Sequence, residues 1–459
     1  MDAISAARPG ECIDSAPHIP ELPFGPPLRV STDRYHSPAW HERERELLWM
    51  RVWQLAGRAN DIPEAGDWME YRLFDQSYVV VRGKDGLVRG FANACRHRGN
   101  AFAQGRGHTA RFTCPYHGWS YGLDGKLLAV AKPDFDGPVE EFVGCKEDLG
   151  LLEIKAECFA GFIFLNPDRN AGPLAEFLGE THDLLAAYHL EEMVPVELNV
   201  RESIHCNWKV VMDAFYEGYH VPSVHPELIP FVNLKKERFR GFGLHGATTV
   251  PFGGPETGQA TPENEVEMIR ALPLPNFPGL AEVLPRFEQL VAEHSVGNGG
   301  EALPQGVTGR GLLQQATREH LTAQGCDVSG LTDSQMSDFQ FWAIFPNIYV
   351  QLRAGEATLI MAWPHADGDP NRCTWRVTSY LWLPPEEREK HAIALTDVPE
   401  GEHFPYFLAL QQDFDQMEDQ QKGLRNKTLE YLTLTKQEPK IAMFHKTLDD
   451  WLASHSGKS

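Results

Sequence analysis

The sequence has no hydrophobic run long enough to cross a membrane. Its longest uncharged, hydrophobic-rich stretch, Phe339–Leu352, contains Pro346 and Asn347 and is shorter than the about 20 apolar residues that a spanning helix needs. The amino-terminal stretch MDAISAARPGECID contains no apolar core of a secretory signal. These absences predict a cytoplasmic protein that does not contact a membrane.

Positive charge is also scarce. The chain has 42 Lys and Arg residues against 64 Asp and Glu residues, and its formal net charge is −22. Such a surface repels polyanions, so nucleic acid and anionic membrane surfaces are excluded as partners. It is compatible with attraction to a basic patch on a partner protein.

Cysteine is sparse: the 459 residues include eight. In a chain of this length without a secretion signal, we expect the thiols to stay reduced rather than to form disulfides. The sequence also lacks a plant-type C-x4-C-x2-C ferredoxin motif and a convincing flavin or nicotinamide module. If the protein does redox chemistry, its electrons must therefore come from a separate protein.

Two of the cysteines belong to the most informative motif of the chain. Cys95, His97, Cys114 and His117 form the pattern C-x-H-x16-C-x2-H, with one thiolate donor and one imidazole donor in each half. A Rieske 2Fe–2S cluster needs this distribution, because one iron takes two Cys and the other takes two His. Zinc also accepts two Cys and two His, but common zinc modules pair Cys with Cys and His with His. The pattern therefore favours a Rieske cluster. Gly99 and Gly118 are expected to turn their N–H groups toward the cluster sulfides.

A second group of candidate ligands lies in the segment NWKVVMDAFYEGYHVPSVHP. Helical spacing would place Asp213, Glu217 and His220 on one face of a helix that ends at Pro222, with His225 in the following turn. Two imidazoles and one carboxylate on one side of a metal, with open positions opposite, form the geometry of non-haem Fe(II) oxygenases. A Rieske cluster needs an electron acceptor, which strengthens this interpretation. Met212 and Phe215 are candidates for the wall of a pocket.

The carboxylate ligand is expected from elsewhere in the chain. The stretch PYFLALQQDFDQMEDQQKGLRN is predicted to be helical, with Pro405 near its start and Gly423 near its end. Spacing alone does not choose among its four acids, which are Asp413, Asp415, Glu418 and Asp419.

The order of patterns along the chain predicts an α+β protein. Residues 1–47 read as an extended arm followed by a helix. Short strands with Gly and Asn turns fill residues 48–167 and predict an all-β domain that carries the Cys/His motif. Residues 168–459 alternate helices and strands and predict a larger α+β catalytic domain. Residues 253–312 are expected to be a long insertion over the site with at most a short helix.

These motifs together resemble the large (α) subunit of Rieske non-haem iron ring-hydroxylating oxygenases. The likeness runs through CRHRGN, CPYHGWSYGLDGKL, the His220/His225 segment and the carboxyl-terminal acidic helix. It implies an all-β Rieske domain plus a helix-grip-like α+β catalytic domain with an antiparallel sheet. It also implies that Asp413 is the third iron ligand, and that Glu217 links the iron site to His117 of a neighbouring subunit. Many relatives have an Asn where this chain has Ala214, so an amide near the iron is missing.

The resemblance implies a terminal oxygenase that uses O₂ and electrons from a separate NAD(P)H reductase, with or without a ferredoxin. Hydroxylation of an aromatic or related hydrophobic substrate is the first expectation, in a homotrimer or with a small β subunit. Asp213 would tune the iron site or relay protons, unless local donors simply satisfy it. Oxidative N- or O-demethylation, a pure electron-transfer protein and a zinc hydrolase are the alternatives.

Overall fold

The computed structural model describes residues 28–130, 145–251, 261, 264–272, 277–296 and 302–457. The chain divides into two compact units, residues 42–177 and residues 1–41 with 178–459. Within the described ranges, no helix combines the length and the apolar character that a membrane crossing requires. Cys12 and parts of the 253–312 segment lie outside the described residues.

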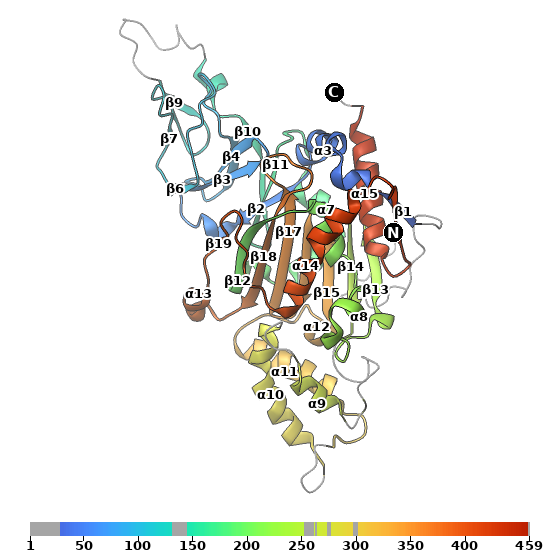
Figure 1. Cartoon of the computed structure of the whole chain (residues 1–459). Coiled ribbons are helices and arrows are strands. Elements are labelled where there is room, and N and C mark those ends of the chain that lie inside the picture. The colour runs from blue at the N-terminus through green and yellow to red at the C-terminus, as the bar shows by residue number, and fades with distance from the viewer. Residues whose placement is uncertain are drawn as a thin grey trace, which may run out of the picture. The chain divides into compact units, whose positions relative to one another are not determined.

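The smaller unit is built from antiparallel strands (Figure 1). A seven-stranded sheet has the order β2-β11-β10-β5-β4-β3-β6, and a second sheet has the order β7-β8-β9. The strands are β2 (Gln54–Arg58), β3 (Asp67–Leu73), β4 (Gln76–Arg82), β5 (Val88–Ala92), β6 (Arg106–His108), β7 (Phe112–Thr113), β8 (Ser120–Tyr121), β9 (Leu127–Ala129), β10 (Glu153–Phe159) and β11 (Phe162–Asn166).

The turns of this unit follow from glycine. Gly86 and Gly125 follow Asp in the KDG and LDG stretches and have φ angles of +80° and +82°. An L side chain rarely adopts this conformation, so glycine is favoured where the chain reverses between neighbouring strands. The all-β prediction for this part of the chain is therefore confirmed.

The larger unit contains an eight-stranded sheet of order β13-β14-β15-β16-β17-β18-β12-β19. Its neighbours pair antiparallel except β12 and β19, which are parallel. The strands are β12 (Met193–Ile204), β13 (Arg238–Phe242), β14 (His245–Val250), β15 (Phe339–Ile344), β16 (Ile348–Arg353), β17 (Glu356–Pro364), β18 (Cys373–Trp382) and β19 (Thr396–Asp397). A separate pair joins β1 (Leu28–Ser31) to β20 (Tyr431–Leu434).

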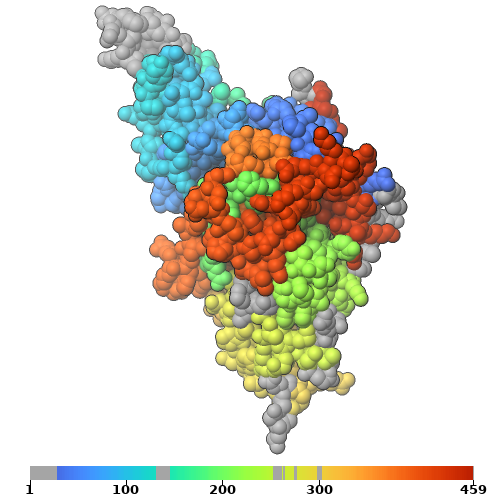
Figure 2. Space-filling view, in the orientation of Figure 1, coloured from blue at the N-terminus to red at the C-terminus, as the bar shows by residue number. Residues whose placement is uncertain are grey.

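Helices cover this sheet and extend from one end of it. Figure 1 shows α7 and α14 lying across the sheet, with α15 beside them, while α9, α10 and α11 project beyond the strand ends. Figure 2 shows the same orange and red carboxyl-terminal segments covering this face of the unit. The helices are α2 (Asp33–His36), α3 (Pro38–Glu44), α5 (Leu174–Leu178), α6 (Glu180–Ala186), α7 (Trp208–Phe215), α8 (Val221–Val224), α9 (Glu265–Arg270), α10 (Pro278–His294), α11 (Gly309–Ala323), α12 (Ser334–Ser337), α13 (Pro385–His391), α14 (Leu408–Leu424) and α15 (Pro439–His455).

The expectation for residues 253–312 was wrong in its helix content. α10 runs over 17 residues, and α11 begins inside the segment. The apolar faces of α9, α10 and α11 form one core, with Leu280, Phe287 and Leu313 fully buried. This amphipathic spacing outweighs the high Gly and Pro content on which the loop prediction rested, because burial of an apolar face is the main source of helix stability in proteins.

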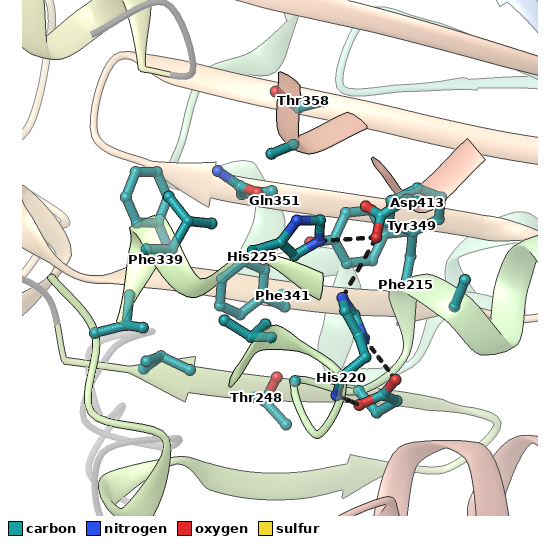
Figure 3. A pocket seen from close by; sticks show the side chains of 18 of the residues that line it. Phe215, His220, His225, Thr248, Phe339, Phe341, Tyr349, Gln351, Thr358 and Asp413 are labelled. Atoms are coloured by element: carbon teal, nitrogen blue, oxygen red, sulfur yellow. Dashed lines mark hydrogen bonds and ion pairs between the residues drawn. The ribbon is translucent and has the colours of Figure 1, made fainter. Parts of the chain in front are cut away.

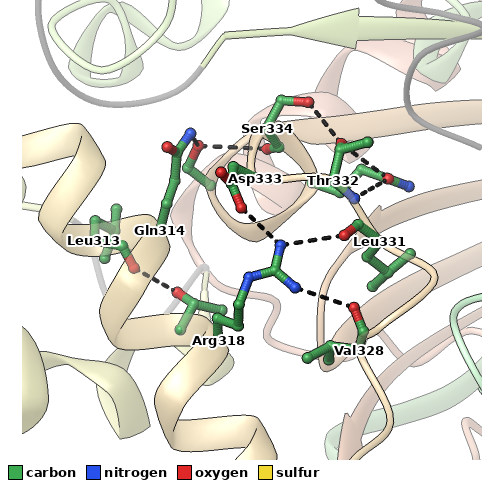
Figure 4. Close-up of polar contacts among 11 residues, drawn as sticks. Leu313, Gln314, Arg318, Val328, Leu331, Thr332, Asp333 and Ser334 are labelled. Atoms are coloured by element: carbon green, nitrogen blue, oxygen red, sulfur yellow. Dashed lines mark hydrogen bonds and ion pairs between the residues drawn. The ribbon is translucent and has the colours of Figure 1, made fainter. Parts of the chain in front are cut away.

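The helical insertion is tied to the chain that enters β15. Arg318 of α11 donates to the carbonyl groups of Val328 and Leu331 at 3.2 and 3.1 Å, and to Asp333 Oδ1 at 2.8 Å (Figure 4). One guanidinium thereby holds three points of the connection between α11 and α12.

Candidate metal centres

The Cys/His motif occupies two loops of the smaller unit. Cys95 and His97 follow β5, whereas Cys114 and His117 lie between β7 and β8. Both cysteines are buried, and the two imidazole rings lie 4.6 Å apart between centroids. The structure thus brings all four predicted cluster residues into one region.

The two loops repeat the same backbone pattern. Cys95 N–H donates to the Asn100 carbonyl at 2.9 Å, and Cys114 N–H donates to the Trp119 carbonyl at 2.8 Å. Gly99 and Gly118, with φ angles of +74° and +69°, donate their N–H groups to the carbonyls of Cys95 and Cys114. The expectation that these glycine N–H groups face sulfide was therefore wrong. Their positive φ closes each loop so that the cysteine points inward.

The spacing of the four side chains fits a two-iron cluster better than one zinc ion. Among the described residues, two groups of three or more His, Cys, Asp or Glu bring their ligand atoms within 4.8 Å of one another, and the Cys/His motif is not one of them. Donors on a single tetrahedral zinc lie less than about 4 Å apart. A cluster spreads its Cys and His ligands over two irons.

Neighbouring residues favour the metal-binding forms of His117 and Cys95. Partial burial, together with the positive charge of Arg98, lowers the pKa of His117 and favours the neutral form of the ring that binds metal. The Tyr121 hydroxyl accepts from Arg96 N–H at 3.0 Å and lies 3.2 Å from Cys95 Sγ, where its own proton would be available to a cysteine thiolate. Burial raises the pKa of Tyr121, which keeps that proton in place.

The second site lies on the wall of a cavity in the larger unit. His225 Nε2 lies 2.8 Å and His220 Nε2 lies 3.4 Å from Asp413 Oδ1, and the three residues form a group that could hold a single ion. Figure 3 shows both rings directed at the Asp413 carboxylate, with labelled aromatic side chains around the site. Asp415, the alternative acid, is exposed and accepts a hydrogen bond from Gln411.

Hydrogen bonds fix which ring nitrogen each histidine presents. Glu217 Oε1 lies 2.6 Å from His220 Nδ1, and Gln412 Oε1 lies 2.8 Å from His225 Nδ1. An oxygen acceptor at Nδ1 holds the proton there and leaves Nε2 free for a metal. Two Nε2 atoms and one carboxylate oxygen are the donor set of a mononuclear non-haem iron site, so the residues fit that metal.

The carboxylates beside His220 and His225 favour a positive charge between the two rings. Burial lowers the pKa of His220, but the hydrogen bond and charge of Glu217 and the charge of Asp413 outweigh it, and the net shift is upward. Burial also lowers the pKa of His225, but the hydrogen bond and charge of Asp413 and the hydrogen bond of Gln412 outweigh it, and the net shift is upward. A bound cation replaces the protons that these carboxylates otherwise attract.

The helix expected through His220 was wrong. α7 ends at Phe215, and His220 precedes the short helix α8, in whose first turn Pro222 lies. Glu217 Oε2 accepts the backbone N–H of His220 at 3.0 Å, so this carboxylate organises the turn as well as the ring. Pro222 therefore starts a helix rather than ending one, as its missing N–H allows.

Asp213 lies behind the iron site in a buried polar network. The Tyr35 hydroxyl donates to Asp213 Oδ2 at 2.5 Å, and His445 Nε2 lies 3.2 Å from Asp213 Oδ1. Arg34 Nη1 lies 3.0 Å from His445 Nδ1, which makes Nδ1 an acceptor and Nε2–H the donor toward Asp213. Tyr35 and His445 thus donate hydrogen bonds to Asp213. This matches the expectation of a buried acid satisfied by local donors, which was the alternative to a role in tuning the iron site or relaying protons.

The cavity has a volume of about 180 Å³ and a mainly apolar wall that includes several aromatic side chains. Phe215 lines it as predicted, whereas Met212 is fully buried in the core and does not. Other lining side chains include Phe277, Phe339, Phe341, Tyr349, Phe407, Thr248, Gln351 and Lys440. Sequence reasoning missed Gln412, Tyr35, His445 and Lys440, because nothing in their local sequence marks them.

Comparisons with known proteins identify the family of both parts of the chain. A family model described as the ring hydroxylating alpha subunit (catalytic domain) matches residues 185–454, and the Rieske [2Fe-2S] domain matches residues 52–141. The chain belongs to the family of Rieske oxygenase alpha subunits. The cofactors of this family are a Rieske 2Fe–2S cluster and one mononuclear iron.

The relatives differ in the substrates that their names state. The oxygenase subunit of carnitine monooxygenase from Acinetobacter pittii is 32% identical over 44% of this chain and 54% of its own length. The alpha subunit of biphenyl 2,3-dioxygenase from Rhodococcus jostii is 37% identical over 42% of each chain. The matched part thus spans about half the length of these relatives.

A solved structure shows the same fold over nearly the whole chain. The quaternary ammonium Rieske monooxygenase CntA in complex with L-carnitine aligns with a TM-score of 0.60. The alignment covers 92% of this chain and 95% of that chain at 19% identity. The predicted α+β fold class is confirmed.

Proposed function

We propose that the chain is the terminal oxygenase component of a reductant-dependent Rieske oxygenase. The observation that carries the proposal is the His220/His225/Asp413 group on the wall of a mainly apolar cavity, in a chain that also holds the Cys/His motif. When bound, the cluster supplies single electrons and the mononuclear iron supplies the activation of O₂. For a monooxygenation, O₂, two electrons and two protons convert a C–H bond to C–OH and release water.

The chain's own residues prepare this reaction. Glu217 and Gln412 hold the two imidazoles in the tautomer that presents Nε2. The mainly apolar wall lowers the polarity of the space in front of the site, which strengthens electrostatic interactions there. Asp213 acts as a positioning residue through the packing of α7 against Tyr35 and His445.

For the substrate, the relatives favour oxidation of an N-methylated ammonium compound over the aromatic hydroxylation expected from the sequence. Carnitine, choline and glycine betaine monooxygenases are among the similar sequences. Aromatic faces bind quaternary ammonium groups through cation–π attraction, and this cavity offers several. Hydroxylation of an aromatic ring stays a second candidate, because the biphenyl dioxygenase subunit is also similar.

The proposed assembly includes partners. A separate reductase, with or without a ferredoxin, would reduce the cluster, and Glu217 would pass electrons from His117 of a neighbouring subunit in a homotrimer or a trimer with small subunits. Residues 48–167 and 168–459 would be the cluster and catalytic domains, in the cytoplasm. Sedimentation of the purified protein tests the assembly. A Glu217→Gln variant tests the electron path, and we expect it to turn over more slowly while it keeps its full iron content.

The activity is tested by O₂ uptake with a surrogate reductase. The panel contains carnitine, glycine betaine, choline, benzoate and biphenyl, and products are identified by mass spectrometry. Release of formaldehyde points to oxidative demethylation, whereas a diol points to ring dihydroxylation. Asp413→Asn should abolish uptake and Asp415→Asn should preserve it. Uptake that survives loss of Asp413 would contradict the proposed site.

A further inference from the structure

Lys440 introduces a buried positive charge into the cavity wall. The residue lies in the first turn of α15, is 1% exposed and lines the same cavity as the His220/His225/Asp413 group. Its Nζ donates to Thr248 Oγ1 at 2.9 Å and to the Phe341 carbonyl at 3.2 Å. An ammonium has three N–H donors, and the third finds no acceptor among the residues that the structure describes.

No carboxylate neutralises this ammonium. Within the described ranges, no carboxylate oxygen lies within 4.0 Å of Lys440 Nζ, and Glu237 and Glu217 act on it only from farther away. Buried lysines are almost always paired. Burial lowers the pKa of Lys440 to about 8, so the side chain is still mainly protonated at neutral pH. The amino-terminal end of α15 adds partial positive charge at the same place.

The groups that hold the ammonium face the space for a ligand. Thr248 and Phe341 both line the cavity, and Figure 3 shows their side chains beside the histidines. The Thr248 hydroxyl accepts from Lys440, so its own proton is available to a second acceptor. A carboxylate placed here would receive one N–H from Lys440 and one O–H from Thr248, both charge-assisted bonds.

We propose that Lys440 and Thr248 form a carboxylate-binding subsite, so that the substrate of this chain is a small molecule with a carboxylate group. The proposal rests on the proposed oxygenase function and narrows its substrate class. The rings of Phe341 and Tyr349 already lie 5.8 and 6.0 Å from Lys440 Nζ. A permanent cation without a carboxylate would add a second positive charge beside this ammonium, whereas a zwitterion or an aromatic acid would bring a negative charge to it.

The test compares matched ligand pairs by isothermal titration calorimetry on the iron-loaded full-length protein. Glycine betaine is paired with choline, and benzoate with benzyl alcohol. We expect at least one acid to bind about tenfold more tightly than its partner, a difference of about 1.4 kcal/mol. Equal affinity within both pairs, or no measurable binding of either acid at millimolar concentration, overturns the proposal.

Variants test whether the preference for acids over alcohols depends on Lys440 and Thr248. Lys440→Met should remove the preference for the acid and leave the affinity of its alcohol partner within about twofold, whereas Lys440→Arg should retain most of it. Lys446→Met, on the exposed side of the same helix, serves as the matched control. Thr248→Val keeps the charge and should cause a smaller loss. A Lys440→Met variant that weakens both members alike, with an unchanged cluster spectrum, shows that the lysine only supports the fold.

The two proposals fail in different ways. An acid preference that depends on Lys440, without coupled O₂ uptake for any bound acid, keeps the subsite and removes the oxygenase function. Coupled uptake with glycine betaine or benzoate that is insensitive to Lys440→Met keeps the function and removes the subsite.

Discussion

At the scale of single residues, Lys440 connects the cavity to the stability of the protein. Its pKa is about 8 in the folded chain against 10.5 for a free lysine side chain. Between these values the unfolded chain binds more protons, so stability must rise with pH in that window. The gain is at most about 3 kcal/mol, because each pKa unit corresponds to about 1.4 kcal/mol.

We therefore expect urea denaturation to show an increase in unfolding free energy from pH 7.5 to pH 10 that the Lys440→Met variant lacks. Comparing the two proteins cancels the titration of the other lysines and tyrosines. An equal pH dependence in both proteins would show that folding does not lower the pKa of Lys440.

Gln412 is the residue whose loss should loosen the mononuclear iron most selectively. Without its oxygen at Nδ1, His225 can rotate or change tautomer, and such outer-shell losses typically cost 10–100-fold in metal affinity. Gln412→Leu should therefore lose iron to a chelator about 10-fold faster than the unmodified protein. Gln420→Leu, exposed on the same helix, should not. Iron retention by Gln412→Leu would show that another contact orients the ring.

Tyr121 should tune the cluster rather than hold it. Its hydroxyl lies 3.2 Å from Cys95 Sγ, and hydrogen bonds to the sulfurs stabilise the reduced cluster. Tyr121→Phe should lower the reduction potential by some tens of millivolts, since one hydrogen bond contributes roughly 1 kcal/mol. Potentiometric titration measures this, with Tyr71→Phe as control because that hydroxyl bonds Gln54 away from the motif.

At the scale of elements, Arg318 joins the helical insertion to the strand that follows it. Arg318→Ala removes bonds to two carbonyls and one carboxylate, which should destabilise this connection by about 1–3 kcal/mol. Hydrogen exchange should quicken in α11 and in residues 326–334 while the strands of the smaller unit stay protected. Arg318→Lys should restore only part of the protection, since an ammonium lacks the guanidinium fork.

Elements also show what the sequence could predict. The Cys/His motif and the His220/His225 pair are short-range patterns whose residue types and spacing carry their chemistry. The end of α7 at Phe215 was not predictable from periodicity, because the Glu217 carboxylate takes over the N–H of His220 and breaks the helix. The choice of Asp413 came from the family resemblance, since helical spacing left four acids open.

Long-range contacts account for the residues that sequence reasoning missed. Gln412 meets His225 across 187 positions, and Lys440 meets Thr248 across 192. Tyr35 meets His445 across 410. Glutamine, lysine and tyrosine are common residues, and only the folded sheet with α14 and α15 packed on it brings these partners together.

At the scale of the whole molecule, the two metal sites belong to different compact units. Each site should therefore be removable by itself. Cys114→Ser should lose about two irons per chain together with the cluster colour, whereas His225→Ala should lose about one and keep the colour. Iron analysis with visible spectroscopy checks both. Loss of all three irons in either variant would mean that the two units do not fold independently.

The last helix, α15, supplies side chains to the cavity and to the buried polar network around Asp213. It brings Lys440 to the cavity, His445 to Asp213 and Asp449 to Arg34. A chain cut before Pro439 would keep every predicted metal ligand and lose Lys440 from the cavity together with the buried apolar side chains of α15. A premature stop codon there would therefore leave the ligands of the mononuclear site in the chain but remove the helix whose His445 supports Asp213 behind them.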